Sequence, residues 1–202
     1  MGLTIHYKFN AGERREDEAR QLIKALHQAA KDLAFERLDE EIIELTGAEC
    51  TIPEGSTPDR WFILKLNAIK RDIHNFDYEE YPVHIIGFTA LPRPGTEELD
   101  IFLCRYPDSP EWMAQSRCKT QYASLPEYGG DANFVLAHTM IIALLDKAQE
   151  LGILEEVVDE SGYWSDRNPH KLIAEGEKWN NLMVEIGNIL GRIPNALRNF
   201  FN

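Results

Sequence analysis

The chain has 202 residues, of which 44% are hydrophobic and 27% are charged, and this composition is ordinary for a globular protein that buries its own core. Its 34 acidic and 21 basic residues give a net charge of −13, which argues against a nucleic-acid partner because phosphate binding needs clustered basic residues. No apolar run approaches the roughly 20 residues that cross a bilayer, and the N-terminus lacks the apolar core of an export signal. We therefore expect a cytoplasmic protein that has neither nucleic acid nor membrane as a partner.

The first half of the chain is expected to begin with a strand and a helix. Apolar and polar side chains alternate over 3–9, which is typical of a half-buried strand. Apolar side chains then recur at helical spacing over 19–33, opposite a charged face. A second strand is expected within 41–45. The segment 60–70 is ambiguous, and we favour a strand there because it begins with bulky apolar residues.

Two strands that form a hairpin are expected in the middle of the chain. The first covers 81–91 and stops at a proline-rich turn, and the second covers 99–106. A further strand is expected over 117–123.

The C-terminal third is predicted to contain two helices separated by a strand. An apolar helix covers 133–151, and a strand follows over 153–159. Asn168 and Pro169 are residue types that commonly start a helix, and a long helix with one apolar face is expected after them. The tail 194–202 is expected to be mobile.

This order of elements predicts the class of the fold. A strand, a helix, a run of strands, and then helix, strand and helix argue against a purely parallel sheet. We expect an α+β fold with a mixed, largely antiparallel sheet and about three helices packed mainly on one face, with pieces that are ferredoxin-like. No low-complexity linker or internal repeat divides the chain, so we expect a single domain over 1–202.

The last strand of the central run carries a row of polar side chains. Alternation along this strand places Arg117, Lys119 and Gln121 on one face of the sheet. His6 and Lys8 of the first strand are expected on the same face. Long polar side chains in such a row need either water or a ligand, so the pattern predicts a solvated sheet surface or a shallow groove for an anionic small molecule.

His138 is a candidate for proton transfer because it lies on the predicted apolar helix. A helix that turns by about 100° per residue places His138 at the rim between the apolar and the polar face. A histidine at that position either hydrogen-bonds a neighbouring loop or carries a proton near neutral pH.

A second candidate group stands at the end of the predicted strand 153–159. Asp159 and Glu160 are adjacent carboxylates, and the aromatic residues Tyr163 and Trp164 follow them. The carboxylates could act as acid or base, or bind a hard cation. Adjacent residues of a strand point to opposite faces, so the two carboxylates do not easily reach one metal, and the aromatic residues could equally close the edge of the core.

The sharp motifs of common enzyme classes are absent. No P-loop, dinucleotide-binding glycine motif, zinc-protease motif or serine-hydrolase motif occurs in the chain. Cys50, Cys104 and Cys118 are an odd number of cysteines without C-x-x-C spacing, so we expect neither a disulfide framework nor a structural zinc knuckle, and we assign no metal ligands. The sequence identifies no cofactor.

Several segments together resemble a group of uncharacterised bacterial proteins. These segments are the MGLTIHY start, the KTQYA sequence at 119–123, His138 and the DESGYW loop at 159–164. The middle of the chain shows little of the pattern, and Ser161 departs from it. The resemblance implies a bacterial intracellular protein and carries no activity. It favours one shared site formed by His6, Lys119, Gln121, His138, Asp159 and Tyr163.

Three functions are consistent with the sequence. The first is a regulatory or binding domain for a small molecule or a protein, which allows a homodimer. The second is a small enzyme that uses His138 with Asp159 or Glu160 for acid–base or metal-assisted chemistry. The third is an acidic decoy that occupies a basic nucleic-acid-binding protein. Convergence of His138, Lys119 and Asp159 in a concave pocket would favour the enzyme.

Overall fold

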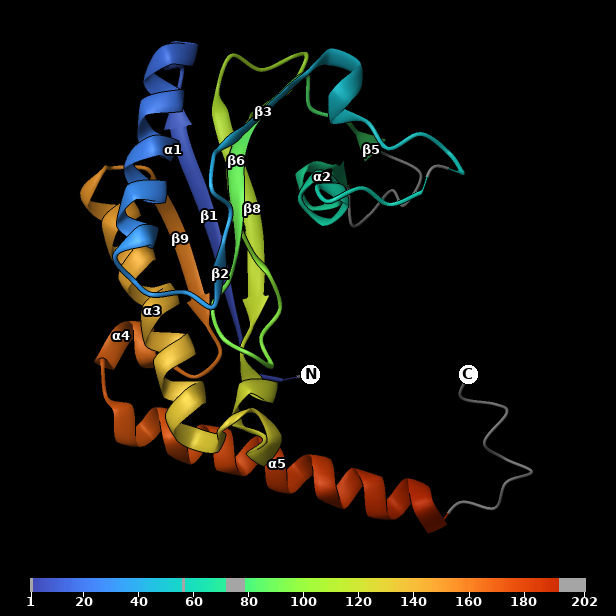
Figure 1. The fold of residues 1–202 in the computed structure, drawn as a ribbon, viewed down its shortest axis with the longest axis vertical. Coiled ribbons are helices and arrows are strands. Elements are labelled where there is room, and N and C mark those ends of the chain that lie inside the picture. Colours follow the sequence, from blue (N-terminus) through green and yellow to red (C-terminus); the bar gives the residue numbers. More distant parts are fainter. Residues whose placement is uncertain (1, 56, 72–78, 193–202) are drawn as a thin grey trace.

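A seven-stranded sheet lies at the centre of the structure, a computed structural model that describes residues 2–55, 57–71 and 79–192 (Figure 1). The strand order is β2-β6-β7-β8-β1-β9, and β3 also pairs with β6. Every strand pairing within the described residues is antiparallel. The strands of this sheet are β1 (Thr4–Gly12), β2 (Arg37–Leu38), β3 (Ile43–Thr46), β6 (His84–Leu91), β7 (Leu99–Arg105), β8 (Trp112–Lys119) and β9 (Leu154–Asp159). A separate small sheet pairs β4 (Lys70–Arg71) with β5 (Glu79–Glu80).

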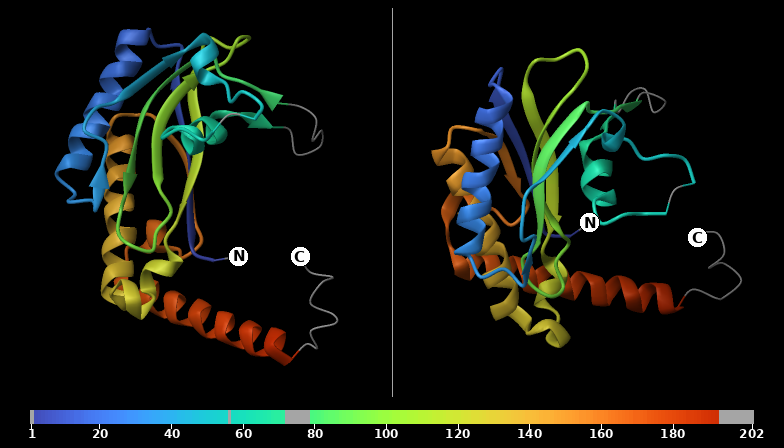
Figure 2. Two further views of the ribbon diagram at one scale, coloured as in Figure 1. Left: turned by 45° about the vertical axis from the view of Figure 1, so that its right-hand side comes forward. Right: turned by 45° about the horizontal axis from the view of Figure 1, so that its top comes forward.

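Helices cover both faces of the large sheet, as Figure 1 and Figure 2 show. The helices α1 and α3 lie side by side on one face, α2 lies on the opposite face, and α5 runs across one end of the sheet. The α-helices are α1 (Glu16–Lys31), α2 (Phe62–Ala68), α3 (Gly130–Glu150), α4 (Tyr163–Asp166) and α5 (Pro169–Arg192). Three short 3-10 helices are η1 (Gly47–Cys50), η2 (Gln121–Ser124) and η3 (Pro126–Tyr128).

The expected α+β class with a largely antiparallel sheet is confirmed. The described residues form five α-helices rather than about three. The two additional helices, α2 and α4, have only seven and four residues, so neither is long enough to show a clear helical period in the sequence.

Strand β1 separates the two sides of the molecule because its side chains alternate. Ile5, Tyr7 and Phe9 are buried in the main hydrophobic core, together with apolar side chains of α1 and α3. His6 and Lys8 point to the opposite face of the sheet, where α2 lies. One set of alternating side chains of β1 therefore packs in the core, and the other set is polar and lies on the α2 face.

The register of β1 decides which later residues share its faces. In the pairing with β8, His6 lies opposite Arg117 and Lys8 lies opposite Gln115. In the pairing with β9, Ile5 lies opposite Asp159. Residues paired in this way point to the same side of a sheet, so Arg117 joins His6 on the α2 face and Asp159 joins Ile5 on the α3 face. The expectation that His6, Lys8 and Arg117 share one face is confirmed.

The strand predicted for 60–70 is wrong, because most of this segment is helix α2. Leu64 and Ala68, one helical turn apart, are buried against the sheet, whereas the side chain of Ile63 is 46% exposed. A short run of bulky apolar residues is compatible with either conformation. Packing of this one-sided helix on the sheet surface selects the helix.

The strand predicted for 117–123 is partly wrong. β8 begins earlier, at Trp112, and ends at Lys119, and Gln121 already belongs to the 3-10 helix η2. Thr120 leaves the extended conformation, with φ −113° and ψ −15°. Its backbone N–H still donates to the carbonyl of Leu3 at 2.9 Å, so the chain turns directly after it pairs with the residue that precedes β1.

The other predicted elements agree with the structure to within a few residues. β1, α1, the β6–β7 hairpin, α3, β9 and α5 lie where the sequence placed them. The three cysteines are buried and free. The tail 194–202, expected to be mobile, lies outside the described residues. Within the part of the chain that is described, no helix combines the length and apolar character needed to span a bilayer.

Candidate functional site

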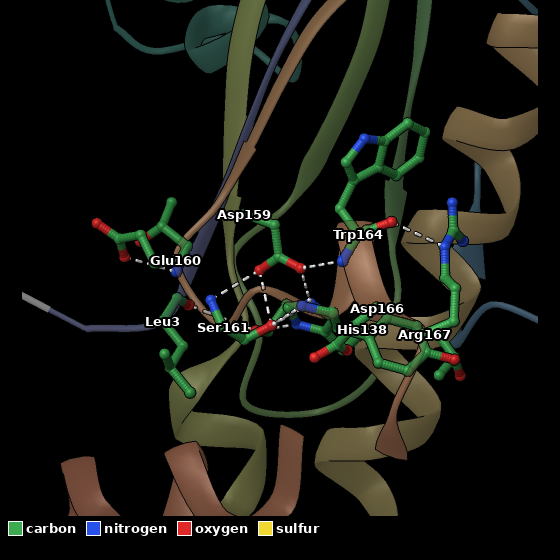
Figure 3. Close-up of polar contacts among 12 residues, drawn as sticks. Leu3, His138, Asp159, Glu160, Ser161, Trp164, Asp166 and Arg167 are labelled. Atoms are coloured by element: carbon green, nitrogen blue, oxygen red, sulfur yellow. Dashed lines mark hydrogen bonds and ion pairs between the residues drawn. The ribbon is translucent and has the colours of Figure 1, made fainter. Parts of the chain in front are cut away.

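His138 stands at the centre of a buried polar cluster on the α3 face of the sheet (Figure 3). Its Nδ1 lies 3.0 Å from the hydroxyl of Thr120, and its Nε2 lies 3.2 Å from both Asp159 Oδ2 and the hydroxyl of Ser161. The residue is 0% exposed, and of the two roles that the sequence left open, its contacts with Asp159 and Ser161 match hydrogen bonding to a neighbouring loop. The rim position is covered because the loop after β9 folds over that flank of α3, which a helical wheel of α3 alone cannot show.

Asp159 is the anchor of this cluster. Its Oδ1 accepts hydrogen bonds from the backbone N–H and the hydroxyl of Ser161 at 2.9 and 2.7 Å, and its Oδ2 accepts from the backbone N–H of Trp164 at 2.8 Å. Burial alone would raise the pKa of Asp159, but the hydrogen bond and charge of His138 and the bonds from Ser161 and Trp164 outweigh it and lower the pKa to about 2. The carboxylate is therefore ionised at neutral pH and fixes the loop after β9.

The geometry of the cluster differs from that of a nucleophilic triad. In a triad, the carboxylate and the hydroxyl contact different ring nitrogens, so that the imidazole can pass a proton between them. Here Asp159 and Ser161 both meet Nε2, and the hydroxyl of Ser161 donates to Asp159. Thr120, at the other nitrogen, is 0% exposed. The cluster therefore fastens α3, β9 and the start of η2 to one another.

Glu160 and Tyr163 take different positions around this cluster. The carboxylate of Glu160 points away from His138 and accepts the backbone N–H of Thr4 at 2.9 Å (Figure 3). The ring of Tyr163 packs edge-on against the ring of His138, with 5.9 Å between the centroids. The structure thus brings Tyr163 and Asp159 to His138 and leaves Glu160 at the solvent-exposed edge of the sheet.

Lys119 and Gln121 lie together near the N-terminus rather than beside His6. A Cβ built on Gly2 would be 2.1 Å from Gln121 Oε1 and 2.5 Å from Lys119 Cε, so both side chains pack against this glycine. Gln121 is 1% exposed, whereas Lys119 Nζ contacts the hydroxyl of Tyr122 at 3.2 Å. The six residues that the resemblance grouped together are therefore divided among three places, and His6 is on the opposite face of the sheet from His138.

A cavity of about 660 Å³ lies between the α2 face of the sheet and α2 itself, and we call it the sheet cavity. Strands β1 and β8 form one wall, α2 and β4 contribute another, and Glu155 of β9 adds a carboxylate. The described lining residues are His6, Lys8, Phe9, Asn10, Leu66, Asn67, Ile69, Lys70, Arg71, Tyr106, Met113, Ala114, Gln115, Ser116, Arg117 and Glu155. Four of them are lysine or arginine, although the chain as a whole is strongly acidic.

Three of these four basic side chains already have acidic partners. Lys8 forms an ion pair with Glu156, Lys70 lies 3.5 Å from Glu80, and Arg71 lies 3.0 Å from Glu79. The hydrogen bond and charge of Glu156 raise the pKa of Lys8. These pairs keep the rim of the cavity close to electrical neutrality.

Arg117 differs from the other basic residues of the cavity. No hydrogen bond, ion pair or ring contact joins its side chain to any residue that the structure describes. It is exposed and lies opposite His6 in the β1–β8 pairing. A guanidinium carries five N–H donors in a planar fork that matches a carboxylate, phosphate or sulfate group. Arg117 therefore offers the cavity an unused site for an anionic group.

Sequence reasoning identified the strand side of the sheet cavity but missed the helix side. His6, Lys8 and Arg117 followed from strand alternation. Asn67 did not, because the segment 60–70 was expected to be a strand, and Arg71 lies just beyond that segment. Helical spacing over 60–70 was the available signal in the sequence, since it places Leu64 and Ala68 on a different face from the polar residues.

Glu16, Glu44 and His84 form another group with metal-ligand side chains, on the α1 side of the molecule. Their ligand atoms lie within 4.8 Å of one another, but Arg20 already occupies the group. Its Nη2 contacts both Glu16 and Glu44 at 2.6 Å, and its hydrogen bond is the largest cause that lowers the pKa of Glu44 to about 2. The guanidinium of Arg20 therefore serves as the cation of this cluster.

No protein-family model, no curated protein and no solved structure matches the chain. The resemblance to a bacterial family therefore stays a prediction, and the geometry of the sheet cavity and of the His138 cluster provides the evidence on function.

Proposed function

We propose that the protein is a ligand-binding or regulatory domain that holds an anionic small molecule in the sheet cavity. The observation that supports this most directly is the guanidinium of Arg117, which has no partner among the described residues and lies in the wall of a cavity of about 660 Å³. Pockets for small ligands typically measure about 300–1,000 Å³, so the size suits a metabolite rather than a macromolecule.

The charge of the whole chain restricts what such a site can do. A net charge of −13 repels anions at long range, so the affinity has to come from direct contacts inside the cavity. Arg117 can supply bidentate, charge-assisted hydrogen bonds, and the paired Lys8, Lys70 and Arg71 line the same cavity without adding much net charge. The apolar side chains of Leu66, Met113 and the neighbouring cavity residues leave room for a carbon skeleton. A small organic carboxylate or phosphate fits this combination best.

The acid–base enzyme that the sequence also suggested is less well supported. It needs a substrate to reach His138, and that side chain is enclosed by Thr120, Ser161 and Asp159. None of these residues lines the sheet cavity. The acidic decoy is disfavoured as well, because many carboxylates, such as Glu16, are paired with basic side chains rather than gathered in one stripe.

The test is a thermal-shift and calorimetric screen of the full chain against small anions and matched neutral compounds. Inorganic sulfate and simple organic carboxylates and phosphates serve as probes. A ligand that binds only the native state raises its stability by about 1.4 kcal/mol for each tenfold excess over Kd. We expect anions to raise the melting temperature and neutral analogues to leave it unchanged.

Arg117→Gln is the decisive variant, and Lys24→Gln is its matched control. Lys24 is an exposed basic residue of α1, on the other side of the sheet, so its replacement removes the same charge without touching the cavity. A charge-assisted hydrogen bond contributes about 1.5–3 kcal/mol, so Arg117→Gln is expected to weaken binding by about 10- to 100-fold. Equal loss in both variants, or no binding of any anion to the unmodified protein, would overturn the proposal.

A further inference from the structure

Asn67 stands between the sheet cavity and a buried carboxylate. It belongs to α2 and lines the cavity, and its amide Nδ2 donates to Oδ2 of Asp100 at 2.7 Å. Asp100 lies on β7, is 1% exposed and does not itself line the cavity. An ionised carboxylate can only accept hydrogen bonds, so it holds the NH₂ group of Asn67 toward itself. The amide oxygen of Asn67 is then the end that remains for the cavity.

Asp100 is poorly compensated for a buried charge. Its Oδ1 is buried and has no hydrogen-bond partner among the described residues. Burial, followed by the negative charges of Glu98 and Asp39, raises the pKa of Asp100 to about 7, although the hydrogen bond from Asn67 lowers it. Asp100 therefore gains or loses a proton close to neutral pH.

Among the residues that the structure describes, no basic side chain forms an ion pair with Asp100. Asn67 faces it from α2, and Glu98 precedes it on the approach to β7. Asp39 approaches from the β2 side, and its own charge is compensated by an ion pair with Arg60. From β1, the hydroxyl of Tyr7 donates at 2.8 Å to the backbone carbonyl of Asp100 and not to its carboxylate. From β8, the buried thiol of Cys118 is the remaining titratable neighbour.

We propose that Asp100 is a positioning residue which, acting through Asn67, couples the binding of an anion in the sheet cavity to the uptake of one proton. The inference rests on the proposed function and adds its regulation by pH. When Asp100 takes a proton from solvent, its new O–H can donate to the amide oxygen of Asn67. A half-turn of the amide then exchanges its oxygen and nitrogen, and the NH₂ group faces the cavity.

The exchange changes what the cavity offers to a ligand. With Asp100 ionised, Asn67 presents an acceptor, and a negative charge lies just behind it. With Asp100 protonated, Asn67 presents two N–H donors, and that charge is gone. An anion binds the second arrangement more tightly, and by linkage the bound anion favours protonation of Asp100. Anion affinity therefore rises as pH falls through neutrality.

The experiment measures the binding of sulfate to the full chain by calorimetry at about pH 6 and about pH 8. Sulfate stays doubly ionised over this range, so the probe adds no titration of its own. Because histidine side chains in general exchange a proton near neutral pH, each comparison is repeated in a His6→Gln background. We expect the affinity to be higher at the lower pH, with a slope of at most about tenfold per pH unit for one linked proton. Repeating the titration in buffers of different ionisation enthalpy gives the number of protons taken up.

Two variants separate the coupling from simple binding. Asp100→Asn keeps the shape and hydrogen-bonding capacity of the side chain and removes the titration, so its sulfate affinity is expected to be independent of pH with no proton uptake. Asn67→Ala leaves Asp100 in place and removes the amide, so its proton uptake is expected to fall below half of the unmodified value. Circular dichroism checks that both variants are folded.

The outcomes distinguish this inference from the proposed function. Sulfate binding that responds to Arg117→Gln but not to pH overturns the proton coupling alone. Sulfate binding that still depends on pH in Asp100→Asn, in the His6→Gln background, also overturns the proton coupling. Absence of sulfate binding at both pH values overturns the proposed function and the coupling together.

Discussion

Two buried aspartates of this protein meet opposite surroundings. Asp159 accepts hydrogen bonds from His138, Ser161 and Trp164, which outweigh the effect of burial and lower its pKa to about 2. Within the described residues, the carboxylate of Asp100 accepts one hydrogen bond, from Asn67, and has two acidic neighbours, and burial raises its pKa to about 7. The difference arises from the number of donors at each carboxylate rather than from depth, since both side chains are almost inaccessible to solvent. Asp159 is consequently a structural anchor, and Asp100 is a group that titrates.

Replacing Asp159 with alanine is expected to destabilise the protein strongly. The change leaves His138 and the backbone N–H groups of Ser161 and Trp164 without their buried acceptor, and removing one partner of such a buried pair typically costs about 3–5 kcal/mol. The free energy of unfolding in urea at neutral pH measures the loss. Asp146→Ala breaks the exposed ion pair with Arg167 and serves as the control, with an expected cost of about 0–1 kcal/mol.

The same carboxylate predicts a pH dependence. Its pKa is lower in the folded than in the unfolded state, so its contribution to stability is complete above the unfolded pKa of about 3.9 and is lost as pH falls toward 2. Unmodified protein should therefore lose stability more steeply than Asp159→Ala in acid. Parallel acid-unfolding curves for the two proteins would contradict the role of Asp159 as an anchor.

Asp100→Asn is expected to have the opposite pH signature. The pKa of Asp100 is higher in the folded than in the unfolded state, so the folded protein retains this proton between about pH 4 and about pH 7. As pH rises across this interval, the protonation of Asp100 should contribute progressively less to the stability of the unmodified protein. The free energy of unfolding should fall by at most about 1.4 kcal/mol per pH unit on account of this group. The gain in unfolding free energy from Asp100→Asn, measured in urea, should thus be larger at about pH 8 than at about pH 4. An equal effect at both pH values would show that Asp100 does not titrate in this range.

At the scale of elements, α2 is the part of the fold that builds the sheet cavity. With seven residues it is too short to be stable by itself, so its position depends on contacts with the sheet. Its own residues Leu64 and Ala68 are buried on the side that faces the sheet, and the hydroxyl of Tyr106 donates to the carbonyl of Ala68 at 2.9 Å. Asn67 adds its hydrogen bond to Asp100. These contacts hold the helix against β7 and β8 and thereby define one wall of the cavity.

The contribution of α2 can be tested by truncating its buried side. Leu64→Ala removes a fully buried side chain and is expected to lower the free energy of unfolding by about 2–5 kcal/mol. Ile63→Ala changes the neighbouring residue, which is 46% exposed, and should cost about 0.5 kcal/mol or less. Urea denaturation measures both free energies of unfolding. Calorimetry with sulfate measures whether each variant still binds an anion in the cavity that α2 helps to form. If Leu64→Ala and Ile63→Ala were equally mild, α2 would not pack on the sheet as described.

At the scale of the whole molecule, the net charge of −13 contrasts with the basic side chains that line the sheet cavity. The α2 face holds four of the 21 lysine and arginine residues in one cavity, while carboxylates such as Glu79, Glu80 and Glu156 balance three of them. The acidic groups in excess repel one another. This repulsion destabilises the folded state, in which they are closer together than in the unfolded chain.

This repulsion predicts that moderate salt stabilises the protein. Raising sodium chloride from about 10 mM to about 150 mM shortens the screening length from about 30 Å to about 8 Å, so the melting temperature at neutral pH should rise. The rise should vanish near the sequence pI of about 4.9, where the net charge is close to zero. Arg117→Gln, measured in parallel, excludes chloride binding in the cavity as the cause. A fall of the melting temperature with salt would indicate that the surface ion pairs outweigh the repulsion.

The sequence by itself determined the elements whose periodicity is long and regular. The alternation of Leu3 to Phe9, the apolar stripe of α1 and the length of α3 identify strand and helices because burial of one face imposes a period of two or of 3.6 residues. The same alternation correctly placed His6, Lys8 and Arg117 on one face. The α+β class follows from the order of these elements, since a run of strands between two helices favours antiparallel pairing.

Only the tertiary structure decided what lies in contact across the sheet. Periodicity along α3 could not reveal that the loop after β9 encloses His138, because the covering residues belong to another element. It could not show that the short apolar run 62–68 folds as a helix on the sheet, where contact with β7 and β8 overrides the local ambiguity. The cavity and the pairing of Asn67 with Asp100 arise from that contact, so both depend on residues brought together from distant parts of the chain.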